Sequence, residues 1–229
     1  VKNTIPDIER AVDYTINSVK NGGRIFYIGA GTSGRLGVLD ASEIPPTYSM
    51  GSNIFIGLIA GGDEALKKSI EGAEDDITHG WEDLKNYNIS ANDSVLGITS
   101  SGRTPYVVGA LKECSNNKIF TGLITSNQDT EAEKYSKNSL RTLLGPEVVT
   151  GSTRMKSGTA QKLILNMIST SLMIKLGRVK GSKMVDMKLS NSKLIDRGIR
   201  FLCDELGIDF ELSEDIKKNT LIHFKFCYK

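Results

Sequence analysis

Short, continuously apolar segments alternate with glycine-rich and helical segments along this chain, and that alternation restricts the possible folds more than any other feature. Five segments are predicted to be strands, at 24–28, 54–59, 94–98, 119–124 and 140–144. Apolar residues at helical spacing predict helices at 5–19, 63–76, 105–113 and after Thr159. Continuously apolar strands between helices are typical of parallel sheets covered on both faces. We therefore predict an α/β fold, a three-layer sandwich with a mainly parallel five-stranded sheet.

Composition argues against several classes of protein. The 229 residues carry 29 basic and 27 acidic side chains, a balance that does not suggest binding to nucleic acid or to a membrane surface. No apolar run reaches the roughly 18 residues of a membrane span. The three cysteines and two histidines lack metal-type spacing, so we expect a reduced cytoplasmic protein without a zinc site.

The first strand is followed by a glycine-rich loop, Gly29-Ala30-Gly31-Thr32-Ser33-Gly34. The pattern G-x-G-x-x-G after a strand allows dinucleotide binding, but the next acidic residue, Asp63, lies further along than the usual ~20 residues. Hydroxyl groups followed by Arg35 suit a terminal phosphate better. A tight turn with Thr32 or Ser33 as helix cap is the alternative.

A second loop of the same kind, Thr99-Ser100-Ser101-Gly102-Arg103-Thr104, follows the third strand. Pro105 is predicted at the first helical position, with Thr104 as its cap. Backbone N–H groups and the dipole at a helix start favour an anion. One such loop is usually only a turn, whereas two after parallel strands favour a small phosphate ligand at the carboxyl ends of the strands.

A third polar segment, 151–159, leads into the long helix. Its basic residues Arg154 and Lys156 could close over an anionic group. An ordinary basic turn explains their composition equally well.

Two acidic segments contain candidates for acid–base chemistry. In segment 40–46, Glu43 stands between an Ala-Ser pair and two prolines, so we do not expect it on a regular helix face. In segment 71–76, Glu71 and Glu74 are predicted to end a helix, where acidic side chains oppose the dipole. Two carboxylates beside a phosphosugar could divide general-acid and general-base work. The residues alone leave the choice between Glu71 and Glu74 open.

At these segments the chain resembles the N-acetylmuramic acid 6-phosphate etherase family, and the resemblance covers most of residues 5–207. The matching stretches are IGAGTSGRLGVLDASEIPPTY (28–48), IAGGDEALKKSIEGAEDD (59–76), SGRTPYVVGAL (101–111), GPEVVTGSTRMKSGTAQKLILNMIST (145–170) and LGRVKGSKMVDM (176–187). The related glucokinase regulatory protein shares parts of the first loop. DASE followed by PPTY, together with EGAED, resembles the etherase rather than the regulator.

The resemblance implies a flavodoxin-like sugar isomerase domain that forms a homodimer and needs no cofactor or metal. It implies conversion of N-acetylmuramic acid 6-phosphate, a phosphorylated amino sugar, and water to N-acetylglucosamine 6-phosphate and D-lactate. By position in DASE, Glu43 would protonate the departing lactyl oxygen, and by position in EGAED, Glu74 would be the base at C2. The expected substrate-binding residues are Gly31, Thr32, Ser33, Ser100, Ser101, Arg103, Thr104, Ser152, Arg154 and Lys156.

The chain departs from the family at three places, one of which is the segment LIHFKF (221–226), where the helical pattern of the family is not kept. It begins inside the usual N-terminal arm, and Ser126-Asn127-Gln128 replaces the usual Asn-Pro after the fourth strand. We expect residues 1–207 to form the catalytic domain and 208–229 to be the remnant of a C-terminal helical module. Two rival functions are a non-catalytic phosphosugar sensor, which would not need both glutamates, and an aldose–ketose isomerase, which needs one base and no leaving-group acid.

Overall fold

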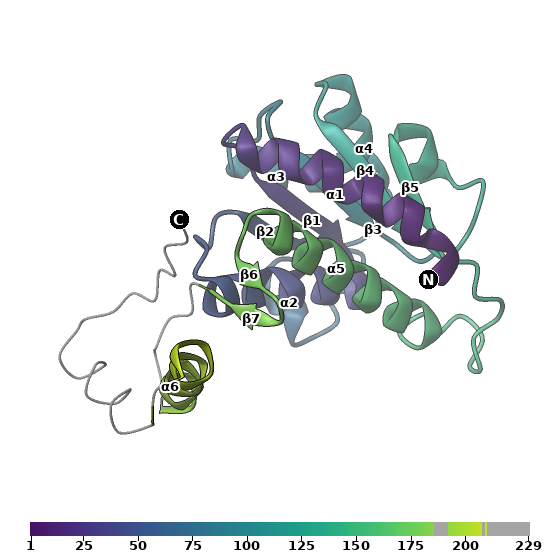
Figure 1. The fold of residues 1–229 in the computed structure, drawn as a ribbon. Helices are drawn as coiled ribbons and strands as arrows, with labels where there is room; N and C mark the ends of the chain where they lie inside the picture. The colour runs from purple at the N-terminus through teal and green to yellow at the C-terminus, as the bar shows by residue number, and fades with distance from the viewer. Residues whose placement is uncertain (186–191, 208, 210–229) are drawn as a thin grey trace. The chain divides into compact units, whose positions relative to one another are not determined.

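A computed structural model of the chain describes residues 1–185, 192–207 and 209 (Figure 1). The chain divides into two compact units. Residues 1–42 and 52–172 form the first, and residues 43–51 and 173–229 form the second. The predicted C-terminal remnant, 208–229, lies outside the described residues apart from Asp209.

The first unit is built on one parallel sheet. Its strands are β1 (Ile25–Gly29), β2 (Phe55–Ile59), β3 (Ser94–Ile98), β4 (Phe120–Thr125) and β5 (Asn138–Arg141). They pair in parallel in the order β2-β1-β3-β4-β5, which confirms the predicted flavodoxin-like α/β fold. The strand order reverses between β1 and β3, and ligands bind at such a switch point in doubly wound sheets. The loops after β1 and β3 therefore lie where a ligand is expected.

Helices cover both faces of this sheet. Helix α1 (Ile5–Lys20) crosses one face, and α3 (His79–Asn86) and α4 (Pro105–Asn116) pack against each other on the opposite face (Figure 1). Helices α2 (Gly31–Tyr48) and α5 (Lys156–Lys175) begin in the first unit and end in the second. Short 3-10 helices are η1 (Lys2–Thr4), η2 (Asp63–Leu66) and η3 (Glu131–Tyr135).

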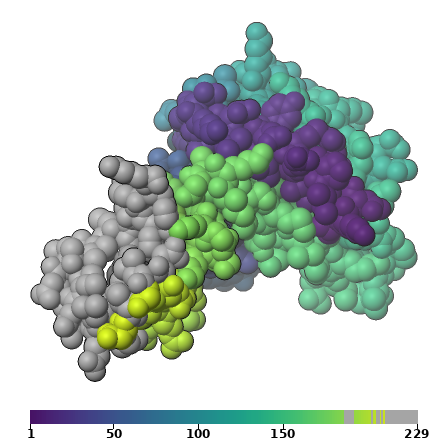
Figure 2. All heavy atoms as spheres, viewed as in Figure 1, coloured from purple at the N-terminus to yellow at the C-terminus, as the bar shows by residue number. Residues whose placement is uncertain are grey.

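The core beneath α4 is formed by alternate residues of the central strands. Phe26 and Val95 are fully buried there and pack with Val107 and Leu111 of the helix. Full burial of an apolar side chain of this size contributes roughly 1.5–3 kcal/mol. On the other face, Tyr14 of α1 stacks on Phe120 with ring centroids 4.1 Å apart. The outer surface of α1, purple in Figure 2, is open to solvent.

The predicted helix at 63–76 is wrong. The structure has only the short η2 there, followed by turns through Asp75. The Arg35 guanidinium accounts for part of this, because its Nε donates to the Leu66 carbonyl (3.1 Å) and its Nη2 to the Lys68 carbonyl (3.2 Å). Those carbonyls bind a side chain from α2 where a helix would use its own N–H groups.

Further details of the elements differ from the predictions. Strand β5 is Asn138–Arg141 and not 140–144, and α5 begins at Lys156 and not after Thr159. Glu43, which was not expected on a regular helix face, lies on α2, and this helix continues through Pro45 and Pro46. Proline removes a backbone donor from a helix but has a helical φ.

The second unit contains further elements that the sequence did not predict. Strands β6 (Val179–Lys180) and β7 (Lys183–Met184) form an antiparallel pair, and helix α6 spans Ser192–Leu206. Among the described residues, no helix is both long and apolar enough to span a membrane.

Candidate functional site

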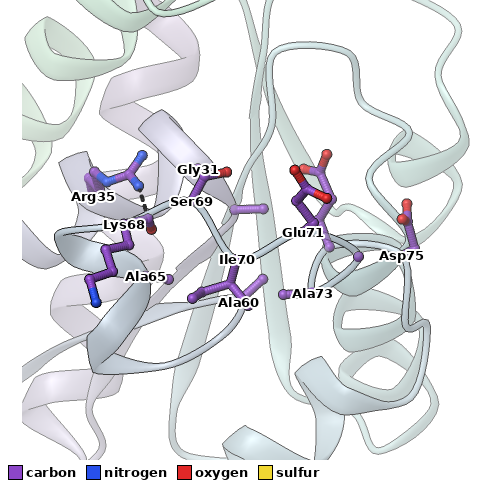
Figure 3. A pocket seen from close by; sticks show the side chains of 13 residues that line it. Gly31, Arg35, Ala60, Ala65, Lys68, Ser69, Ile70, Glu71, Ala73 and Asp75 are labelled. Atoms are coloured by element: carbon purple, nitrogen blue, oxygen red, sulfur yellow. Dashed lines mark hydrogen bonds between the residues drawn. The ribbon is translucent and has the colours of Figure 1, made fainter.

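A cavity of about 300 Å³ lies in the first unit, beyond the carboxyl ends of β1 and β2 (Figure 3). Such a volume is at the lower end of the range typical of small-molecule sites. The residues that line it are Ala30, Gly31, Arg35, Ala60, Ala65, Lys68, Ser69, Ile70, Glu71, Gly72, Ala73, Glu74 and Asp75. The cavity thus joins the first glycine-rich loop to the acidic segment after β2.

Charge is divided between the two sides of this cavity. Arg35 and Lys68 lie on one side, and the carboxylates of Glu71 and Asp75 lie on the other (Figure 3). Glu71 and Glu74 both line the cavity, so their location does not show which of the two is the base. The turns that replace the predicted helix place both acids there.

The acidic segment is attached to the start of α4. The backbone carbonyl of Glu74 accepts a 3.0 Å hydrogen bond from the backbone N–H of Tyr106. Tyr106 is buried, and its hydroxyl donates to Asp83 Oδ2 at 2.6 Å. Burial raises the pKa of Tyr106, and the acceptor Asp83 raises it further. The phenol is therefore a fixed donor that holds α3 to α4 next to the second loop.

Hydroxyl groups in the second loop bind one another. Thr99 Oγ1 and Thr104 Oγ1 are 2.9 Å apart, and the Arg103 N–H donates to Ser101 Oγ at 3.2 Å. Pro105 occupies the first turn of α4, as predicted, and Thr104 is the capping residue. Its side chain makes no capping hydrogen bond, and its hydroxyl contacts that of Thr99 instead.

Three donors fix the second loop through one carbonyl. The Ser100 carbonyl accepts from the Asn127 side-chain amide (2.8 Å), the Ser126 N–H (3.1 Å) and the Thr125 hydroxyl (3.2 Å). Asn127 belongs to the segment that departs from the etherase pattern. No pattern in the sequence predicts this role of Asn127, which depends on β3 and β4 being neighbours.

Gly102 allows the second loop to lie against the segment before η3. Its φ is +67°, a conformation that favours glycine, and a Cβ atom would lie 2.4 Å from both Cβ and Oγ1 of Thr130. The Gly102 carbonyl also accepts from the Ala132 N–H at 3.0 Å. Loop position and backbone conformation therefore depend on the same glycine.

The first and second loops are joined by Gln161 of α5, a residue that the sequence analysis missed. Ser33 Oγ donates to Gln161 Oε1 at 3.0 Å, and Gln161 Nε2 donates to Ser100 Oγ at 3.0 Å. All three side chains are buried. Gln161 lies inside the GTAQKLILN stretch, but nothing in its spacing indicates these contacts.

The third segment reaches the first loop as well. Gly158 lies against Thr32, whose Cγ2 would be 3.3 Å from a Cβ at position 158. The predicted basic residues behave differently from one another. Lys156 Nζ donates to the Leu144 carbonyl at 2.8 Å, whereas Arg154 is exposed and Ser152 is half-buried.

The start of α5 is held by Glu147, another residue that the sequence analysis missed. Its carboxylate accepts from the backbone N–H groups of Ser157 (2.9 Å) and Lys156 (3.0 Å). The Ser157 N–H is the main cause of a lowered pKa of Glu147. A carboxylate at a helix N-terminus is stabilised by the unpaired N–H groups and by the dipole.

Glu43 is exposed on α2, one turn after the buried Asp40. Asp40 Oδ1 accepts from Asn166 Nδ2 (2.7 Å) and Ser169 Oγ (3.1 Å), which attaches α2 to α5 within the first unit. Burial raises the pKa of Asp40, although these donors, the Tyr27 hydroxyl and the charge of Lys162 oppose the change. In the described part of the chain, no group of three or more His, Cys, Asp or Glu residues could hold a metal ion.

Comparison with known proteins gives two domain matches. The glucokinase regulatory protein N-terminal SIS domain matches residues 7–115, and the SIS domain matches residues 79–171. Among solved structures, a phosphoheptose isomerase from Francisella tularensis has a TM-score of 0.58 at 17% identity, covering 73% of this chain and 85% of that one. At that identity the likeness concerns the fold alone.

Several curated proteins match at much higher identity. The N-acetylmuramic acid 6-phosphate etherase of Christiangramia forsetii is 58% identical over 216 residues, which are 94% of this chain and 79% of that protein. The protein of the same name from Clostridium acetobutylicum is 54% identical over 220 residues, which are 96% of this chain and 73% of that protein.

Proposed function

This chain belongs to the N-acetylmuramic acid 6-phosphate etherase family, and we propose that it carries out the reaction with Glu74 as base and Glu43 as acid. The enzyme cleaves the lactyl ether of its substrate and releases D-lactate and N-acetylglucosamine 6-phosphate. The choice of Glu74 over Glu71 rests on its position in the EGAED stretch. The place of Glu74 in the lining of the cavity, with its backbone bonded to the start of α4 beside the second loop, supports this choice.

Elimination followed by addition of water accounts for the products. In the open-chain sugar, the aldehyde at C1 acidifies the hydrogen on C2, and Glu74 removes that proton. The C3–O bond then breaks, and the electron pair of the C2–H bond becomes the C2=C3 double bond. Glu43 protonates the departing lactyl oxygen, because an alkoxide leaves poorly. Water adds its hydroxyl to C3 and a proton returns to C2. Positioned acids and bases each contribute typically ~10²–10⁴-fold in rate.

The phosphate group of the substrate is proposed to lie between the first and second loops. Ser33 and Ser100 share Gln161, so hydroxyl groups of the two loops are within one side chain of each other. The start of α4 adds backbone N–H groups and a favourable dipole. From the third segment, Gly158 contacts Thr32, and Arg154 has an exposed side chain that can supply positive charge.

We also propose that the enzyme is a cytoplasmic homodimer that needs no cofactor or metal. The family resemblance supports these properties. Light scattering of the purified chain tests the dimer, and a single-chain mass at micromolar concentration would contradict it. Lactate release should be unchanged after exhaustive treatment with a chelator, and loss of activity that a divalent ion restores would contradict the metal-free reaction.

The decisive experiment is incubation of the full chain with N-acetylmuramic acid 6-phosphate in water enriched in oxygen-18. Release of D-lactate is expected, with the heavy isotope at C3 of N-acetylglucosamine 6-phosphate and none in lactate, because the C3–O bond breaks. Isotope in lactate would mean that the other C–O bond is cleaved. Tight binding of the sugar phosphate without lactate release would favour a phosphosugar sensor. Conversion to a ketose would favour an isomerase.

A further inference from the structure

The Gln161 side chain lies between the two proposed phosphate loops and binds one serine of each. Gln161 is 1% exposed, and its Oε1 and Nε2 atoms are each 3.0 Å from a serine oxygen. Ser33 follows β1, Ser100 follows β3, and Gln161 belongs to α5. Three segments far apart in the sequence therefore meet in one chain of hydrogen bonds.

The direction of these hydrogen bonds differs at the two serines. A hydroxyl has one proton to donate and two lone pairs to accept with. The proton of Ser33 is donated to Gln161 Oε1, so it is not available to another acceptor. Ser100 instead accepts from Gln161 Nε2, and its own proton remains free for donation. An ionised phosphate accepts hydrogen bonds and, as a dianion, has none to donate.

We propose that Gln161 is a positioning residue that makes Ser100, rather than Ser33, the principal hydroxyl donor to the phosphate group of the substrate. This role rests on the proposed function, because it presupposes a phosphate ligand between the loops. Gln161 itself does not touch the ligand. It acts by orienting the Ser100 hydroxyl and by keeping the two loops at a fixed separation.

The position of Gln161 is well suited to that role because α5 is fixed near its start. Glu147 accepts from the N–H groups of Lys156 and Ser157, and Gly158 lies against Thr32 of the first loop. Further along the helix, Asn166 donates to Asp40 of α2. Hydrogen bonds before and after Gln161 therefore hold the helix, so its amide has little freedom to move away from the serines.

Two substitutions test the direction of the hydrogen bonds. Gln161→Glu keeps the shape but has no donor when ionised, so Ser100 would donate its proton to the new carboxylate. Gln161→Met keeps the length and removes both polar atoms. We expect the Kd for N-acetylglucosamine 6-phosphate, measured by calorimetry on the full chain, to rise about tenfold or more in both variants. The Kd for unphosphorylated N-acetylglucosamine should change far less.

Ser169→Ala is the matched control. Ser169 is another buried polar residue of α5, and its hydroxyl donates to Asp40 and to the Asn166 carbonyl. Its loss should lower the urea midpoint without the phosphate-dependent change in Kd. An equal loss of affinity in Ser169→Ala would show that any weakening of α5 has this effect, and would overturn the specific role of Gln161.

A double-mutant cycle completes the test. If Gln161 acts through Ser100, Gln161→Met should have little further effect on the Kd in a Ser100→Ala background, because coupled residues are not additive. Full additivity would contradict the proposal. If the Gln161 variants do not fold, the two serine variants still test the proposal. Ser100→Ala should weaken binding of N-acetylglucosamine 6-phosphate at least about threefold more than Ser33→Ala. The reverse order would overturn the proposal. Wild-type binding of the sugar phosphate without lactate release would refute the etherase assignment and leave this proposal standing.

Discussion

The backbone carbonyl of Glu74 accepts a 3.0 Å hydrogen bond from the backbone N–H of Tyr106. Tyr106 lies in the first turn of α4, directly after the second loop. The contact uses main-chain atoms only, so the acidic segment remains attached beside the proposed phosphate loop whatever side chain stands at position 74. A mutation of the Glu74 side chain can therefore remove the catalytic base without removing the proposed phosphate site.

Glu74→Gln should abolish lactate release and also solvent-deuterium exchange at C2, with a loss of about 10²–10⁴-fold in rate. Affinity for N-acetylglucosamine 6-phosphate should change far less, because the backbone contact is kept. Glu71→Gln is the control, since Glu71 lines the same cavity. Mass spectrometry of the sugar reports exchange, and a coupled assay reports D-lactate. A larger loss in Glu71→Gln would transfer the role of base to Glu71.

Glu43→Gln should behave differently, because it removes the acid and leaves the base in place. Lactate release should fall by a similar factor of about 10²–10⁴. Exchange of the C2 proton in unreacted substrate should continue, provided that proton removal is reversible. NMR of substrate in deuterium oxide measures this. Exchange that stops in Glu43→Gln and persists in Glu74→Gln would reverse the two roles.

Gly102→Ala should destabilise the protein more than Gly22→Ala, although both glycines have positive φ (+67° and +77°). The shared backbone strain costs roughly 1–2 kcal/mol. At Gly102 the new Cβ would also overlap Thr130, whereas nothing lies within 4 Å of a Cβ at Gly22. Urea unfolding of the two variants measures the difference. Equal free energies of unfolding would show that the loop moves away from Thr130 without cost.

Asp40→Asn should change how stability depends on pH. Burial raises the folded-state pKa of Asp40 above the value of about 3.9 expected in the unfolded chain. The resulting stabilisation is fully present below pH ~4 and is lost as pH rises through the folded pKa. Asparagine does not titrate. The free energy of unfolding of the native protein, relative to that of Asp40→Asn, should therefore fall as pH increases from about 4.

Urea unfolding of both proteins at several pH values between 4 and 8 measures this difference. Asn166 and Ser169 can still donate to the asparagine oxygen, so the variant is expected to fold. A difference that stays constant with pH would show that the pKa of Asp40 is the same in the folded and unfolded states.

The sequence by itself determined the elements whose signals are local. Buried strands such as β3 (Ser94–Ile98) coincide with continuous apolar runs, and Pro105 marks the start of α4, because burial on both faces and the fixed φ of proline act within a few residues. Long matching motifs also pointed to the family. From these signals the parallel sheet and the loops at its carboxyl edge could be predicted.

Only the tertiary structure decided which residues hold those loops. Gln161 is 128 positions from Ser33 and 61 positions from Ser100 in the sequence, and no periodic pattern of residues indicates either hydrogen bond. The same applies to Arg35, which donates hydrogen bonds to the carbonyls of Leu66 and Lys68. These bonds favour turns where the sequence predicts a helix. Hydrogen-bond partners supplied by another element override local helical propensity here, because propensity is a weak preference and a backbone carbonyl can be paired by a donor from any element that reaches it.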